Sequence, residues 1–169
     1  MSKAGKYVIY SVLVLMILVM TGGSLFAEEP DLITDRPDFT ESANAVPNGS
    51  WQFEMGYTFA KDKPLTDHTI GELLVRFAVI ENFEFRAGVN SYHVAKIGGN
   101  SYKGLDDMSL GVKWALVPGT LAVIASTSVP TGAKVFRTSK LQPGLTVSLA
   151  KDLSETVSLG SNLGVTSLY

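Results

Sequence analysis

Acidic and basic side chains alternate with apolar ones along four segments of this sequence. They share the polar faces of those segments and are Glu54, Glu72, Arg76, Glu84, Arg86, Asp107 and Lys113. Side chains of both signs on one face can line a water-filled channel and act as an electrostatic filter for solutes. They can equally pair across strands into a static ladder, in which each pair contributes about 0.2–1 kcal/mol. The sequence leaves both interpretations open.

Residues that usually carry covalent or metal chemistry are scarce. The 169-residue chain contains no cysteine, which excludes a disulfide framework, a thiolate zinc site and a cysteine nucleophile. Its two histidines, His68 and His93, are 25 residues apart and near different expected loops, and no cluster of ligands accompanies them, so no metal site is expected. Ser91 with His93 is the nearest approach to a nucleophile–base pair, and neither a Gly-x-Ser-x-Gly elbow nor an evident orienting acid accompanies it. We predict a protein that is not an enzyme and needs no cofactor.

The segments that hold the charged residues are predicted to be β-strands. Apolar and polar residues alternate with a period of two, and no stretch after residue 30 shows the helical repeat of i, i+3, i+4 and i+7. Trp51, Phe53 and Met55, for example, share one face, while Gln52 and Glu54 share the other. The expected strands cover residues 51–60, 69–80, 83–91, 106–115, 120–129, 142–151 and 156–166.

The predicted connections alternate between long and short. The long ones cover residues 61–68, 92–105 and 130–141, and the others are tight turns. Short periplasmic turns and long extracellular loops are typical of a transmembrane barrel, and bacterial single-chain barrels have even strand numbers. We therefore predict an all-β fold: an antiparallel up-and-down transmembrane β-barrel, with about seven strands that form part of a larger even-stranded barrel.

Aromatic residues favour a membrane barrel over a soluble one. A soluble lipocalin-like barrel would show the same alternation with its apolar face turned inward. Trp51, Phe83 and Trp114, however, fall at the strand ends beside the short turns, where rings of membrane barrels lie at the level of the headgroups. We expect these rings in an interfacial girdle surrounded by outer-membrane lipid. Arg76 and Arg86 should point inward, because an arginine facing lipid at mid-bilayer costs roughly 2–4 kcal/mol.

The N-terminal region predicts export. Lys3 and Lys6 precede an apolar run over residues 8–20, and small residues lead to Ala27; this is the pattern of a secretory signal peptide. We assign residues 1–27 to the signal peptide, 28–49 to a polar periplasmic or lumenal leader, and 50–169 to the strands of an incomplete barrel. Export and barrel-assembly machinery are the expected partners. The formal net charge of −2 argues against nucleic-acid binding.

The leader and the first strand resemble a known family. The leader reads TDRPDFTES over residues 34–42 and VPNG over 46–49, followed by the strand WQFEMGY; GLDD at 104–107 and SVPTG at 128–132 add to the pattern. These stretches resemble the outer-membrane transporter family labelled "MetA-pathway of phenol degradation", with this chain as a C-terminally truncated member. The leader residues that carry the resemblance are Thr34, Asp35, Arg36, Pro37, Asp38 and Glu41.

The resemblance implies a Sec-exported barrel that passes small hydrophobic or aromatic compounds across the bacterial outer membrane, in either direction. A non-conducting structural or binding barrel in the same membrane is an alternative, and a soluble periplasmic lipocalin-like barrel is another. The leader has two interpretations as well. Asp35, Arg36, Asp38 and Glu41 form a constriction in the lumen or at its periplasmic mouth, or they belong to a solvated segment held by local turn hydrogen bonds.

Overall fold

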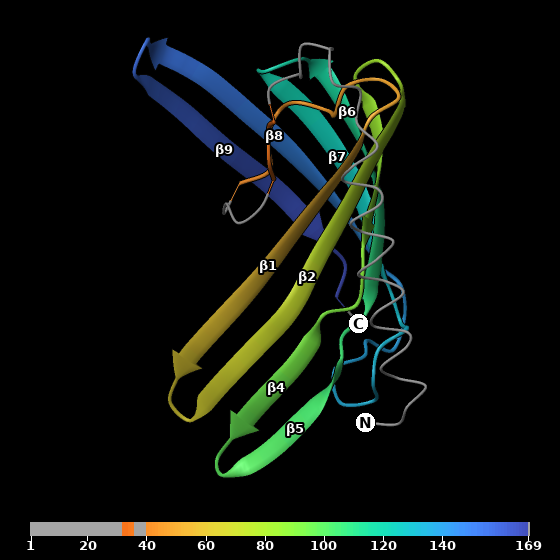
Figure 1. Ribbon diagram of the computed structural model, residues 1–169, viewed down its shortest axis with the longest axis vertical. Helices are drawn as coiled ribbons and strands as arrows, with labels where there is room; N and C mark the ends of the chain where they lie inside the picture. Colours follow the sequence, from red (N-terminus) through yellow and green to blue (C-terminus); the bar gives the residue numbers. More distant parts are fainter. Residues whose placement is uncertain (1–31, 36–39, 169) are drawn as a thin grey trace, which may run out of the picture. The chain divides into compact units, whose positions relative to one another are not determined.

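The computed structural model of the chain describes residues 32–35 and 40–168. The predicted signal peptide and the motif residues Arg36, Pro37 and Asp38 lie outside the described residues. Within them the protein is all-β, and no helix is long and apolar enough to cross a membrane. The strands form one antiparallel sheet that curls into a half-barrel (Figure 1).

Nine strands make up this sheet. They are β1 (Trp51–Asp62), β2 (Leu65–Ile80), β3 (Phe83–Gly88), β4 (Tyr92–Ile97), β5 (Asn100–Leu105), β6 (Met108–Val117), β7 (Leu121–Val129), β8 (Gln142–Ser154) and β9 (Val157–Thr166). Each pairs with its neighbours in antiparallel orientation. The predicted all-β, antiparallel, up-and-down arrangement is confirmed.

Two of the three predicted long loops are wrong. Residues 61–68 continue β1 and β2 around a tight turn at Lys63-Pro64. Residues 92–105 form the β4–β5 hairpin, whose turn uses positive φ angles at Gly98 and Gly99, a conformation that glycine adopts at little cost. The first stretch contains two lysines, two aspartates and a proline, and the second contains two lysines and three glycines. The apolar alternation that identified the other strands therefore fades there. Only the connection over residues 130–141 remains a long loop.

The extra hairpin lengthens existing strands and adds no new position across the sheet. Leu74 on β2 pairs with Gly88 on β3. Leu65, nine residues earlier on β2, pairs with Ile97 on β4, nine residues after Gly88. Because one register covers both segments, β4 continues the line of β3. The pairings of β5 with β4 and of β6 with β3 likewise share one register, so β5 continues the line of β6. The sheet therefore has seven strand positions, as many as the strands predicted.

The two faces of the sheet reverse the usual distribution of polar and apolar side chains. On β1, Trp51 and Phe53 are 59% and 51% exposed, while Glu54 between Phe53 and Met55 is 6% exposed. Arg76 and Lys113 have no exposed surface at all. Lysine and arginine are almost never fully buried unless they are paired. The charged side is the inner face, which the leader covers, and the apolar side is the outer face.

The three aromatic residues predicted for a girdle lie at one end of the sheet, beside the short turns. Trp51 begins β1 and stacks on Phe77, with 4.0 Å between ring centroids. Phe83 begins β3 and is the cross-strand partner of Trp114 near the end of β6. Their placement at a lipid interface stays a prediction.

Amide hydrogen exchange tests the β4–β5 hairpin. Because β4 lies between β2 and β5, we expect slow exchange for consecutive amides over residues 92–97, as in any strand paired on both sides. The flanking amide of Gly99 in the turn should exchange fast. Exchange over 92–97 as fast as in the loop residues Lys134 and Val135 would show that the stretch is a loop after all.

Candidate functional site

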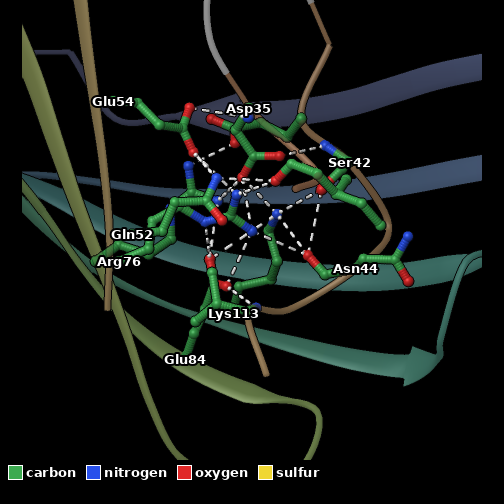
Figure 2. A network of polar contacts seen from close by, with 12 residues as sticks. Asp35, Ser42, Asn44, Gln52, Glu54, Arg76, Glu84 and Lys113 are labelled. Atoms are coloured by element: carbon green, nitrogen blue, oxygen red, sulfur yellow. Dashed lines mark hydrogen bonds and ion pairs between the residues drawn. The ribbon is translucent and has the colours of Figure 1, made fainter. Parts of the chain in front are cut away.

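The leader places one carboxylate at the centre of the inner face. Asp35 is 4% exposed. Its Oδ2 atom lies 2.6 Å from Lys113 Nζ, 2.7 Å from Arg86 Nη1 and 3.4 Å from Arg76 Nη2. The three cations come from β6, β3 and β2, so a single leader atom joins three strand positions (Figure 2).

Two strand carboxylates bind both the cations and the leader main chain. Glu84 accepts from Arg76 Nε at 2.9 Å through one oxygen and from the Val46 N–H at 2.7 Å through the other. Glu54 accepts from Arg76 Nη1 at 3.0 Å and from the Asp35 N–H at 2.9 Å. Each carboxylate thus ties a leader amide to the inner face at the same time as it neutralises a buried cation.

Leader carbonyl groups complete the coordination of the cations. The Asn44 carbonyl oxygen accepts from Arg76 Nη2 at 3.1 Å and from Lys113 Nζ at 3.2 Å. The Ile33 carbonyl oxygen accepts from Arg76 Nη1 at 2.9 Å. Farther along, the Ser148 hydroxyl on β8 donates to a leader carbonyl. No buried side-chain nitrogen or oxygen of these residues lacks a partner in the described part of the chain, and a fully satisfied buried network holds its members in one arrangement.

The network shifts the two leader carboxyls in opposite directions. Burial opposes ionisation of Asp35, but Lys113, Arg86 and Arg76 together outweigh it and hold its pKa well below the usual range. For Glu41, burial raises the pKa, and repulsion from Asp35 offsets part of the attraction of Arg86. Glu41 still pairs with Arg86, with 2.5 Å between Oε2 and Nη2, and its side chain is 37% exposed.

Most of the charged residues singled out in the sequence meet in this network. The residues brought together from the strands are Glu54, Arg76, Glu84, Arg86 and Lys113, joined from the leader by Asp35 and Glu41. Asp107 lies elsewhere, directly before β6, and Glu72, which accepts from the Thr58 hydroxyl on β1, borders the adjoining cavity. Arg76 pairs across strands with Glu54 and Glu84, as the ladder interpretation described. The ion pairs from Asp35 and Glu41 of the leader belong to neither interpretation of the strand charges.

Several members of the network were not identified from the sequence. Ile33 and Asn44 take part through carbonyl oxygens, which every residue carries, so no side-chain pattern marks them. The residue type of Ser148, a serine within an expected strand, indicates no role. Gln52, which donates to Glu54 Oε1 at 2.8 Å, is expected on the polar face of its strand, again with no role.

A cavity of about 390 Å³ adjoins the network on the inner face. Asp35, Glu41 and Arg86 border it on the side of the network. Its other walls carry small or hydroxyl side chains, three aliphatic ones, a tyrosine and the Glu72 carboxylate, namely Gly56, Tyr57, Thr58, Glu72, Leu74, Ser109, Leu110, Gly111, Ile124, Ser126 and Thr146. Since a cavity of about 150 Å³ already accommodates benzene, this space fits a small solute with both apolar surface and hydrogen-bonding groups.

At the other end of the strands, the long loop folds onto the inner face. Asp107 accepts from the Gly132 N–H at 2.8 Å and from the Thr138 hydroxyl at 2.6 Å. Phe136 stacks on His93, with 5.0 Å between ring centroids. Along β6, the cavity wall at Ser109 and Gly111 therefore lies between this loop and the network at Lys113.

The surroundings of His93 do not form a catalytic pair. His93 Nδ1 lies 2.9 Å from Asp67 Oδ2, and its Nε2 lies 3.4 Å from Asp106 Oδ2. An acid beside His93, not evident in the sequence, is thus present, but both ring nitrogens face carboxylates and neither bonds to Ser91. Among the described residues no group of histidines and carboxylates is arranged to hold a metal ion.

Comparison with protein-family models gives a match over most of the chain. A family model described as "MetA-pathway of phenol degradation" matches residues 34–168. A search of curated proteins and a search of solved structures each found no match.

Substitution of Asp35 tests the central position of this carboxylate. Asp35→Asn keeps the side chain's shape but leaves three buried cations without their shared counter-ion, and removing one partner of a buried pair costs about 3–5 kcal/mol. We expect a loss of that size in the free energy of unfolding, measured by urea titration of the full chain folded in detergent micelles. Asp62→Asn, at an exposed site, is the matched control and should stay within about 0.5 kcal/mol. Equal effects of the two variants would contradict the assignment.

Acid should weaken the attachment of the leader. The pKa of Asp35 in the folded chain lies below its ordinary value of 3.8, so below about pH 4 the unfolded chain binds more protons than the folded one. The stability due to Asp35 is therefore present above that pH and is lost as the pH falls further. Glu41 acts oppositely: its raised pKa means that its contribution declines as the pH rises above about 4.5.

The measurement is the free energy of unfolding against pH for the wild type, Asp35→Asn and Glu41→Gln. Asp35→Asn should flatten the acid limb below about pH 4, and Glu41→Gln should remove the opposing trend above it. An acid limb unchanged in Asp35→Asn would place the responsible carboxyl elsewhere.

Proposed function

The chain belongs to the MetA-pathway of phenol degradation family, and we propose that it is an outer-membrane barrel protein through which small hydrophobic or aromatic compounds pass by diffusion. Export through the predicted signal peptide and insertion by the barrel-assembly machinery are part of this proposal. The residues described here carry out no covalent step in it.

The observation that carries the proposal is the apolar outer face of the sheet. Leu110, Leu145 and Leu163 on β6, β8 and β9 are 48%, 47% and 76% exposed, while the charged side chains are buried on the other side. Apolar surface left in water costs about 25 cal/mol per Å², whereas in hydrocarbon this cost vanishes. The ten residues of β6 and of β9 also match the 9–11 that a tilted strand needs to cross the bilayer. A lipocalin-like barrel would require the opposite orientation of the faces.

The cavity supports passage of solutes. It combines hydroxyl groups from Thr58, Ser126 and Thr146 with aliphatic surface from Leu74 and Ile124. A phenol-like solute has the same two kinds of surface, so it could hydrogen-bond to the wall without losing apolar contact. The charges next to the cavity are already paired, and they give the lumen a polar border without a strongly attractive site that would retain the solute.

A non-conducting barrel is the second candidate, and the leader favours it. The leader crosses the inner face and is bound there by buried ion pairs to three strand positions. A lumen closed in this way would serve as a rigid support for the outer loops. The two candidates predict different electrical behaviour.

Single-channel recording in planar bilayers separates them. We expect the chain to conduct once its two open sheet edges are paired in a closed barrel, and we expect phenol to reduce the ion current by occupying the cavity. Ser148→Ala removes one leader contact on β8 without touching the ion pairs, so it should raise the open-state conductance or the frequency of opening. Asp62→Asn should behave as the wild type. A folded, inserted and electrically silent chain would reject the channel in favour of the non-conducting barrel.

A further inference from the structure

We propose that a basic row on the outer face, formed by Lys61, Lys96 and Lys103, binds the phosphate groups of phosphorylated lipids in the leaflet at the loop end of the strands. The inference rests on the proposed membrane location. It adds a specific lipid partner. It also gives a way to orient the chain in the membrane from the position of the lysines, independently of the lengths of the loops.

The strand register places the three lysines together. Lys61 on β1 pairs with Thr66 on β2, Thr66 pairs with Lys96 on β4, and Lys96 pairs with Ser101 on β5. Directly paired residues project to the same face, and adjacent strands are about 4.8 Å apart, so the Cα atoms of Lys61 and Lys96 are separated by about 10 Å. Lys103 follows Ser101 by two residues and projects to the same face. All three lysines are exposed.

The same register shows that the basic row adjoins the apolar outer face. Lys103 pairs with Val94, Val94 with His68, and His68 with Phe59. Phe59 is 52% exposed and precedes Lys61 by two residues on the outer face of β1. The aromatic surface of β1 is therefore contiguous with the basic row. A ligand that contacts the aromatic surface and the lysines together needs an apolar chain and an anionic group. A phosphorylated lipid has both, whereas free phosphate has only the anionic group.

Exposed charges at the two ends of the strands differ in sign. At the loop end the exposed charged residues in the described chain are Lys61, Asp62, Lys63, Lys96, Lys103, Lys134, Arg137 and Lys140. At the end with the short turns they are Glu81, Lys151, Asp152 and Glu155. A surface dominated by cations attracts anionic lipid headgroups over about one Debye length.

Nearby carboxylates lie away from the outer face that carries the lysines. Asp62 follows Lys61 directly on β1 and therefore projects to the opposite face. Asp67 and Asp106 face His93 at 2.9 Å and 3.4 Å on the inner side. Asp107 is occupied by Gly132 and Thr138 of the long loop. On the outer side, the Thr66 and Ser101 hydroxyls lie between the lysines and add hydrogen-bond donors for phosphate oxygens.

Native mass spectrometry of the full chain in detergent micelles tests the proposal. The probe is a bisphosphorylated lipid A, with the same lipid after removal of both phosphates as the comparison. We expect the wild type to retain the phosphorylated lipid, and Lys96→Gln to weaken retention by about fivefold, the effect of one lysine at an anionic membrane surface. The triple variant K61Q/K96Q/K103Q should abolish retention. Lys151→Gln, which removes an exposed strand lysine at the other end, is the matched control and should retain the lipid as the wild type does.

Equal retention of the two lipids would overturn the proposal, as would equal losses in Lys96→Gln and Lys151→Gln. Insertion into zwitterionic vesicles is measured in parallel and should be unchanged in every variant. A wild-type chain that fails to insert would reject the membrane location itself. A chain that inserts but shows no preference for phosphate would reject only the basic row.

Discussion

Charge compensation on the inner face is the constraint on which the rest of the structure depends. Arg76, Arg86 and Lys113 are buried on three strand positions, and the buried strand carboxylates Glu54 and Glu84 are too few to neutralise them. A buried unpaired cation is too costly to persist. Asp35 supplies the missing charge from outside the sheet. The leader and the strands are thus one folding unit, even though the sequence presents them as a polar extension followed by a sheet.

This arrangement explains why the two faces have opposite characters. The polar groups are satisfied by one another and by leader carbonyls, which leaves the inner face with little need for water. The outer face receives the large apolar side chains that a water-soluble protein would place in its core. The described chain has only a small buried apolar cluster around Ala43, Ala115 and Ala122. Its order comes chiefly from strand pairing and from the charge network.

Alternation in the sequence was sufficient to predict the strands whose two faces differ strongly, such as β1 and β6. It failed for β4 and β5, because Lys96, Gly98 and Lys103 leave no clear apolar face to follow. The buried position of Arg76 and Arg86 followed from their side of the alternation. The way they are neutralised did not, because Ile33 and Asn44 contribute backbone carbonyl oxygens that carry no side-chain signature. The site residues were thus largely predictable, and their partners in the leader only in part.

The seven strand positions have a geometric consequence. Every neighbouring pair is antiparallel, so six reversals separate β1 from β9, and the two edge strands run in the same direction. Two such sheets placed edge to edge in one membrane orientation would meet in parallel at both junctions. Any assembly that closes this sheet into a fully antiparallel ring must therefore contribute an odd number of strands between β9 and β1.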